Sequence, residues 1–413
     1  MVETEVQKER VILVGVSEQD GDDTKDSLEE LKELVATAGA VTEGMVIQNR
    51  ERIHPGTYVG TGKVSEIKEM LATTGATGIV CDDELSPAQM KNLEDLLDTK
   101  VMDRTLVILD IFAAHASTSE GKIQVELAQL RYSMTRLAGF GRSMSRLGGG
   151  IGTRGPGEKK LEMDKRIIRT RISQLKRELA EVKKHREVAR GQRMRNHVPV
   201  AAIVGYTNAG KSTLLNHLTH AGVLEEDKLF ATLDPTTRQL ELPGKQQILL
   251  TDTVGFIRKL PHHLIEAFKS TLEEAKYADF IIHVVDASNP QADKQMYIVY
   301  NTLRELDIRD KKIVTLFNKM DRPEADRELR DFRADHTARI SARNDRDLET
   351  VKELLAQVLR ENKTYMEHVF SYEDAGKIQV IRRKGELLSE EYTPEGIFVK
   401  AYIPAEVYDR LGI

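Results

Sequence analysis

The residues best suited to chemistry lie in a glycine-rich segment that ends in lysine and serine. This segment, GYTNAGKS, directly follows the apolar run Val200 to Val204. Its glycines let backbone N–H groups approach phosphate oxygens, the lysine adds a positive charge, and the serine hydroxyl can bind magnesium. We therefore predict a phosphate-binding loop between a strand and a helix N-terminus, which favours the anion. The predicted binding residues are Gly205, Tyr206, Thr207, Asn208, Ala209, Gly210, Lys211, Ser212 and Thr213.

Two later segments could sense the γ-phosphate and the metal. Asp252 follows a predicted strand and can reach magnesium through water, while the backbone amide of Gly255 can meet the γ-phosphate. Between loop and strand, Thr236 is the expected switch threonine, with Thr237 as the alternative. The predicted set is then Asp252, Thr253, Val254 and Gly255 for nucleotide binding, Lys211, Thr236 and Gly255 for hydrolysis, and Ser212, Thr236 and Asp252 for Mg²⁺.

A third pair of segments predicts that the base is guanine. The Asp321 carboxylate can accept two hydrogen bonds, from the N1–H and the exocyclic amine of guanine, and adenine offers no such pair. A short segment after another strand could place a backbone amide on the guanine O6. The predicted guanine-binding residues are Asn318, Lys319, Met320, Asp321, Ser341, Ala342 and Arg343. The expected ligands are GTP and GDP.

The residue after Gly255 is Phe256, and its apolar ring cannot orient an attacking water. We therefore expect slow intrinsic hydrolysis that depends on help from outside the site. Asn208 could coordinate a potassium ion, or it could only hydrogen-bond the switch segment. Arg238 could donate charge, although a surface role is favoured for it.

The elements that must position these residues predict an α/β protein. In the first 120 residues, strands at Val11 to Val16 and Gly78 to Cys81 alternate with helices at Asp26 to Ala38 and Ser86 to Leu97. Strands at Val200 to Val204, Ile248 to Leu250, Ile281 to Val285 and Ile313 to Phe317 form the P-loop domain. Strands at Ile378 to Ile381 and Ile397 to Tyr402 predict a small α+β domain. The predicted domains are residues 1–120, 121–197, 198–361 and 362–413.

In the second of these domains, residues 121–197, the spacing of apolar residues predicts a helical hairpin. Ile123, Leu127, Leu130, Met134 and Leu137 form one narrow seam, and Leu161, Ile168, Ile172, Leu175, Leu179 and Val182 form another. Residues 139–157 between them hold eight glycines, which we expect to break the helix. A second helix from Glu158 to Arg195 would span about 57 Å. The prediction is an arm with a flexible, basic tip.

This arm is strongly basic within an acidic protein. Residues 131–197 carry a net charge of +13, although the whole chain carries −5. Such asymmetry favours a polyanionic partner such as RNA, while the alternative is a solvated helical face. The candidate RNA contacts are Arg142, Arg146, Arg154, Lys159 and Lys160.

Composition excludes several classes of protein. The 413 residues are 40% hydrophobic and 31% charged with a mean hydropathy of −0.41, which is typical of soluble globular proteins. We find neither an apolar run long enough for a membrane span nor a secretory signal, so we expect a cytoplasmic protein. The single cysteine, Cys81, rules out an internal disulfide and is expected to be buried.

Taken together, these motifs resemble the HflX family of ribosome-associated GTPases. The resemblance rests on TYVGTGK at 57–63, DELSP at 83–87, DRT at 103–105, ELAQL at 126–130, GGGIGTRGPGE at 148–158 and DTVGFI at 252–257. It implies a factor that binds the large ribosomal subunit and its RNA, places the arm tip near the peptidyl-transferase region, and splits stalled ribosomes in stress. It also implies GTP hydrolysis stimulated by the ribosome. We expect a monomer.

Two other functions stay open at the level of sequence. The chain could be an assembly factor that uses GTP as a binding switch on immature RNA. It could also be a metabolic enzyme that uses the amino-terminal domain, although we find no convergent acid/base residues there.

Overall fold

The computed structural model of the protein contains two compact units that alternate along the chain. Residues 1–184, 226–234 and 257–270 form the first unit, and the second comprises residues 185–225, 235–256 and 271–413. Short segments on either side of the predicted switch residues therefore belong to the first unit. The structure describes residues 8–18, 23–147, 156–195, 198–219, 229–230, 233–261, 274–325, 327–361 and 363–411.

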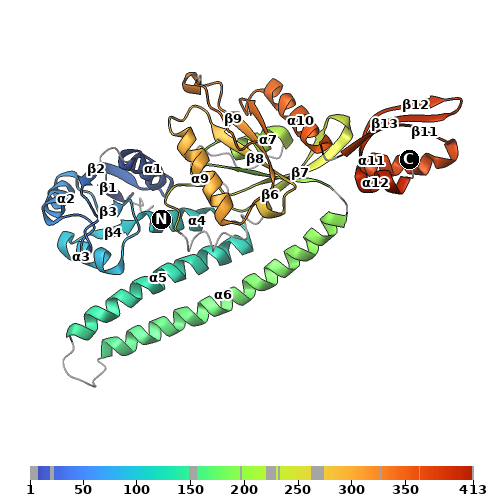
Figure 1. Ribbon diagram of the computed structural model, residues 1–413. Helices are drawn as coiled ribbons and strands as arrows, with labels where there is room; N and C mark the ends of the chain where they lie inside the picture. The colour runs from blue at the N-terminus through green and yellow to red at the C-terminus, as the bar shows by residue number, and fades with distance from the viewer. Residues whose placement is uncertain are drawn as a thin grey trace, which may run out of the picture. The chain divides into compact units, whose positions relative to one another are not determined.

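The first unit begins with a four-stranded parallel sheet in the order β2-β1-β3-β4 (Figure 1). Strand β1 is buried along nearly its whole length, as expected where helices cover both faces of a sheet. Ile12 and Val14 of β1 pack with Ile67 of α2 and Leu93 of α3. The predicted α/β domain is confirmed. Its elements are β1 (Arg10–Ser17), α1 (Thr24–Thr37), β2 (Val41–Asn49), α2 (Thr61–Thr74), β3 (Gly78–Cys81), α3 (Pro87–Leu97), β4 (Lys100–Asp103) and α4 (Arg104–His115).

The helical arm follows as α5 (Ser119–Leu147) and α6 (Pro156–Arg195). The predicted seams do meet, because Leu127 of α5 packs against Ile172 and Leu175 of α6. Arg171 adds a two-pronged ion pair to Glu126, with N–O distances of 2.7 and 2.9 Å. Sequence periodicity therefore predicted which faces of the two helices meet.

The predicted break at residue 139 is wrong. Helix α5 continues through Gly139 and Gly141 to Leu147. An interior glycine costs a helix only about 1 kcal/mol, so two of them within a 29-residue helix do not end it. Of the rest of the predicted tip, residues 148–155 lie outside the described residues, and residues 156 and 157 already belong to α6.

The second unit contains a six-stranded sheet in the order β10-β9-β8-β5-β7-β6, in which only the β6–β7 pair is antiparallel. Leu214 and Leu215 of α7 join Val351 and Leu355 of α10 in its main core. The elements are β5 (Val200–Gly205), α7 (Lys211–Thr219), β6 (Thr236–Leu242), η1 (Pro243–Lys245), β7 (Gln246–Asp252), β8 (Phe280–Asp286), α9 (Ala292–Glu305), β9 (Lys312–Asn318), η2 (Pro323–Ala325), β10 (His336–Arg339) and α10 (Asp345–Arg360).

The same unit ends in a three-stranded antiparallel sheet in the order β11-β13-β12 with two helices. The α+β class is confirmed, but the strand predicted at Ile378 to Ile381 is wrong, because these residues lie in α11. Only Ile378 and Ile381 are buried there, and a spacing of three places both on one helical face. The elements are β11 (Lys363–Phe370), η3 (Tyr372–Asp374), α11 (Ala375–Lys384), β12 (Glu386–Thr393), β13 (Gly396–Pro404) and α12 (Ala405–Leu411).

Candidate nucleotide site

The predicted phosphate loop leaves the carboxyl end of β5 and enters α7 at Lys211. A Cβ at Gly205 would lie 2.3 Å from the Val284 carbonyl oxygen, so no side chain fits there. Gly210 has a φ of +95°, a backbone conformation that favours glycine. The two glycines therefore give the loop its tight path, as the motif predicts.

Lys211 lies beneath this loop and is almost completely buried. Its Nζ donates to the carbonyl oxygen of Tyr206 at 2.8 Å. Burial lowers the pKa of Lys211 to about 8. The ammonium is therefore held in the concave side of the loop, where a phosphate could replace lost hydration.

The predicted metal-binding residues come together at the ends of β6 and β7. The hydroxyl of Ser212 donates to Oδ2 of the buried Asp252 at 2.8 Å. Thr236 is the register partner of Asp252 across β6 and β7. Thr237 instead places its hydroxyl 2.9 Å from that of Thr251. Neighbouring residues of a strand point to opposite faces, so Thr236 and Thr237 are not equivalent.

This hydroxyl and carboxylate set fits magnesium. Mg²⁺ prefers oxygen ligands and usually takes one or two from protein and the rest from phosphate and water. Among the residues that the structure describes, no three His, Cys, Asp or Glu side chains gather as a metal cage. Ser212, Asp252 and Thr236 are thus the candidates that would share the ion with a nucleotide.

Gly255 approaches the phosphate loop so closely that a side chain would collide with it. A Cβ at Gly255 would lie 2.9 Å from both Nζ of Lys211 and Cα of Thr207. The next residue, Phe256, is buried and pairs with the loop through backbone bonds, from its N to the Gly205 oxygen at 3.1 Å and from Thr207 N to its oxygen at 2.8 Å. Phe256 is thus a structural link between two motifs.

The predicted guanine segments meet at the ends of β9 and β10. Nδ2 of Asn318 donates to the carbonyl oxygen of Ala209, and its Oδ1 accepts from the backbone N of Ala342, both at 2.9 Å. Ser341 Oγ donates to Asp321 Oδ1 at 2.7 Å, and this bond lowers the pKa of the Asp321 carboxyl. An ionised Asp321 is the state that a guanine acceptor requires.

Two acids in this region were not predicted from the sequence. Asp286 accepts from Nζ of Lys319 at 2.8 Å, and Asp347 accepts from the backbone N of Ser341 at 2.7 Å. Lys319 also donates to the Asn208 carbonyl oxygen at 2.7 Å. Asp286 ends a strand whose seven residues are all buried, and an acid in that position is the signal that could have revealed it.

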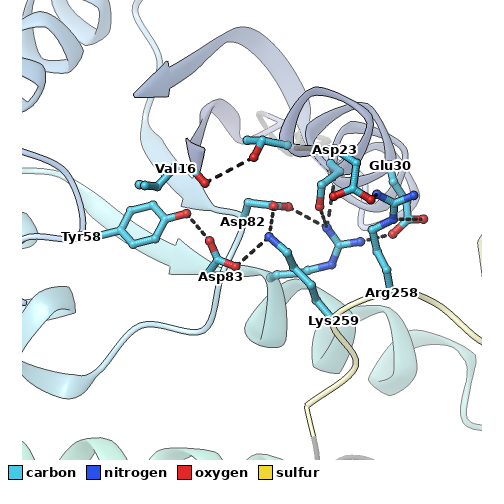
Figure 2. Close-up of polar contacts among 11 residues, drawn as sticks. Val16, Asp23, Glu30, Tyr58, Asp82, Asp83, Arg258 and Lys259 are labelled. Atoms are coloured by element: carbon cyan, nitrogen blue, oxygen red, sulfur yellow. Dashed lines mark hydrogen bonds and ion pairs between the residues drawn. The ribbon is translucent and has the colours of Figure 1, made fainter. Parts of the chain in front are cut away.

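Beyond Phe256 the chain enters the first unit, where a cluster of acids holds it (Figure 2). Lys259 points between Asp82 and Asp83, with Nζ–O distances of 2.5 and 2.7 Å. Asp83 also accepts from the Tyr58 hydroxyl at 2.6 Å. Lys259 has a φ of +53°, a conformation that a non-glycine residue seldom adopts without compensating contacts.

The cluster lies where ligands bind in other open α/β sheets. Asp82 follows β3, whose neighbour on one side is β1. From β1 the chain continues to β2 on one side of the sheet, and from β3 it continues to β4 on the other, so the topological switch point lies between β1 and β3. Asp82 is fully buried and also accepts from Arg104 at 2.7 Å. Burial raises the pKa of Asp82, but Arg104 and Lys259 outweigh it and hold that pKa below its ordinary value. Arg258 pairs with Asp23 at 2.9 Å.

Other predicted residues are placed only in part. Arg142 and Arg146 fall in α5 and Lys159 and Lys160 in α6, but their side chains lie outside the described part, as does all of Arg154. Arg238 and Arg343 are exposed.

None of the described helices is long and apolar enough to cross a bilayer. Cys81 is buried, as predicted.

Comparisons with known proteins find similar families and a similar solved structure. Family models described as GTP-binding GTPase N-terminal, GTP-binding GTPase Middle Region and 50S ribosome-binding GTPase match residues 25–113, 115–193 and 200–319. A solved GTP-binding protein from Sulfolobus solfataricus in complex with GDP is 25% identical with a TM-score of 0.44, over 84% of this chain and 98% of its own.

Curated relatives match over most of the chain. GTPase HflX of Lacrimispora saccharolytica is 67% identical over 100% of this chain and 97% of its own. GTPase HflX of Caldanaerobacter subterraneus is 46% identical over 98% and 93%, and that of Escherichia coli 45% identical over 76% and 73%. With a complete phosphate loop and guanine segments in place, this chain belongs to the HflX family of GTPases and is a GTP hydrolase.

Proposed function

We propose that this GTPase binds the large ribosomal subunit and its RNA, and splits or rescues stalled ribosomes under stress, in the cytoplasm and as a monomer. The observation that carries the proposal is the basic two-helix arm in a member of this family. The match to a model described as a 50S ribosome-binding GTPase supports the partner. Ribosomal RNA is a polyanion, which the basic side chains of the arm would attract through its phosphates.

The described part of α6 supports phosphate contact. A hollow along this helix is lined by four basic residues and one acid. Arginine and lysine side chains attract phosphate without recognising sequence, so they fit the backbone of folded RNA. The lining residues are Glu162, Lys165, Arg166, Arg169, Thr170, Ser173 and Arg177.

In the nucleotide site, Lys211 would contact the β- and γ-phosphates and the Gly255 amide would meet the γ-phosphate. Ser212, Thr236 and Asp252 would hold Mg²⁺, which when bound neutralises phosphate charge. Buried Phe256 has no group that could orient water, so intrinsic hydrolysis would be slow and the ribosome would accelerate it. Asn208 would be the residue to hold K⁺, if the site uses it.

The test is GTP turnover by the full chain, alone and with large subunits, at several fixed salt concentrations, together with sedimentation of intact ribosomes. We expect stimulated turnover and release of separated subunits. Replacing Arg166 and Arg169 by glutamine should weaken binding and reduce the salt slope by about one per lost phosphate contact. The matched control removes two charges far from α6 in sequence, Arg309→Gln with Lys311→Gln.

Three outcomes would count against the proposal. Turnover that large subunits leave unchanged, with GTP still bound, would remove the ribosome as activator. Tighter binding to subunit precursors than to mature subunits would favour the assembly-factor alternative. Equal loss of binding in the α6 variant and in its control would show that the arm is not the contact.

A further inference from the structure

The carboxylate of Asp234 lies at the start of arm helix α5. Its Oδ2 accepts hydrogen bonds from the backbone N of Ser117 at 2.9 Å, the Ser117 hydroxyl at 2.7 Å and the backbone N of Thr118 at 2.8 Å. Its Oδ1 accepts from the Thr118 hydroxyl. Four donors from two residues therefore converge on one side chain that is more than a hundred positions away in sequence.

These two residues are also the ones that begin the helix. The Thr118 hydroxyl oxygen accepts from the backbone N of Gly121 at 3.0 Å, which is the bond of a helix N-cap. Asp234 in turn orients that hydroxyl. A Cβ at Gly121 would lie 2.4 Å from Oδ1 of Asp234, so the carboxylate is packed closely against the first turn. Asp234 thus completes the cap of α5.

The environment favours an ionised Asp234. Burial raises the pKa of this carboxyl, but the bonds from Thr118 and Ser117 outweigh it and lower the pKa overall. A negative charge at a helix N-terminus is also stabilised by the helix dipole.

The segment before Asp234 is held in the same unit by apolar contacts. Phe230 places its ring against that of Phe112 in α4, with centroids 4.7 Å apart and an interplanar angle of 72°. Leu229 and Leu233 are buried as well. The segment is therefore anchored by two kinds of contact, and Asp234 is its last residue within the first unit.

Only Pro235 separates Asp234 from Thr236, the candidate switch threonine. Two residues of extended chain span at most about 7 Å, and proline fixes one of the intervening dihedrals. Thr236 opens β6 opposite Asp252, the candidate metal carboxylate. A displacement of Thr236 larger than this short link allows must move Asp234 or break its bonds to Ser117 and Thr118.

We propose that Asp234 is a positioning residue that couples the nucleotide site to the arm, by completing the cap of α5 only when Thr236 occupies one of its two nucleotide-dependent positions. Because coupling between two sites is reciprocal, a ligand on the arm that changes the start of α5 shifts the affinity for GTP relative to GDP by the same factor. Coupling within the chain needs no ribosome. Its use in response to the ribosome rests on the proposed function.

The test is hydrogen–deuterium exchange of peptides covering residues 117–125 in the full chain, with GDP and with a non-hydrolysable GTP analogue. We expect exchange to differ between the two nucleotides. In Asp234→Ala the first turn should exchange about 3- to 30-fold faster, the loss expected for a helix cap, and equally with either nucleotide. Thr118→Ser, which keeps the hydroxyl, should retain the nucleotide difference, and Thr118→Val should reduce it.

The matched control is Ser86→Ala. Ser86 caps α3 in the same unit, where its hydroxyl accepts from the backbone N of Gln89 at 3.2 Å. That variant should speed exchange at α3 and leave the nucleotide difference at residues 117–125 intact. Equal exchange with both nucleotides in the wild-type chain, or a difference that persists in Asp234→Ala, would overturn the coupling.

A second measurement separates this inference from the proposed function. The ratio of large-subunit affinities with the GTP analogue and with GDP should fall toward one in Asp234→Ala. A variant that keeps the wild-type ratio would refute the coupling even though the ribosome is bound. If the wild-type chain binds no large subunits, the proposed function fails and the exchange experiment alone decides the role of Asp234.

Discussion

Gly255→Ala tests whether the close approach of two motifs is what makes the site sensitive to the γ-phosphate. The added Cβ would lie 2.9 Å from Cα and Cγ2 of Thr207 and from Nζ of Lys211. Carbon atoms in contact normally sit about 3.5–4.0 Å apart, so the two segments must separate by roughly 0.6–1.1 Å. Because Cα of Thr207 is backbone, the strain cannot be relieved by a rotamer change.

Overpacking of this kind costs about 1–3 kcal/mol, which corresponds to about a 5- to 150-fold loss of affinity. The loss should fall on the GTP analogue, since in the proposed site only a γ-phosphate would contact the Gly255 amide. The assay is equilibrium titration of the variant with fluorescent GDP and with a non-hydrolysable GTP analogue at fixed magnesium. GDP affinity should change much less.

The control for this variant is Gly62→Ala in α2, where a Cβ meets nothing within 4 Å. Alanine is also the better helix former there, so nucleotide affinities should be unchanged. Equal weakening of GDP and GTP-analogue binding in Gly255→Ala would refute the reasoning, because it would place the clash on the phosphate loop itself and not on contact with the γ-phosphate.

Three further predictions concern charge. The Lys211 pKa of about 8 predicts that GTP affinity, measured by titration from pH 7 to 9.5, falls as pH rises through 8, because the free protein then loses the ammonium that phosphate requires. Asp321→Asn should reduce GTP affinity by at least about 100-fold in competition binding, since the amide presents a donor to guanine N1–H. Lys259→Met should lower the unfolding free energy, measured by urea titration, by about 1–2 kcal/mol. This value is discounted for solvent screening because the Lys259 side chain is 36% exposed. The control Lys63→Met, which removes a surface ion pair with Glu66, should cost less than about 1 kcal/mol. The pKa of Asp82 is lowered in the folded state, so this difference should be present above about pH 4 and fade as pH falls below it.

Local sequence patterns predicted the elements whose partners lie close along the chain. The phosphate loop followed from a strand, glycines and lysine in immediate succession, and the arm followed from a heptad-like spacing that places Leu127 opposite Ile172 and Leu175. The failures have physical causes. The strand at Ile378 to Ile381 was wrong because a short apolar run does not distinguish a strand from one turn of an amphipathic helix.

Local sequence patterns could not predict the polar contacts between residues far apart in the chain. Lys259 meets Asp82, which is 177 residues away, and Asp234 meets Thr118 at a separation of 116. Neither pair has a spacing or composition that distinguishes it from solvated surface charge. The local sequence gives one sign of these contacts. Two cations, Arg258 and Lys259, directly follow the DTVGFI motif, where a loop exposed to solvent would not require them.

These contacts affect how a conformational change at the nucleotide site can be transmitted to the first unit. Two of the points at which the chain passes between the two units are Asp234 to Pro235 and Phe256 to Ile257. Each crossing lies within two residues of a candidate γ-phosphate sensor, Thr236 or Gly255. Asp234 holds the chain at one crossing through Ser117 and Thr118, and Lys259 holds it at the other through Asp82 and Asp83. We therefore expect movement of either sensor to strain or release a contact of the first unit. Most of the arm belongs to that unit, so these short links are covalent routes by which GTP and a ligand on the arm can influence each other.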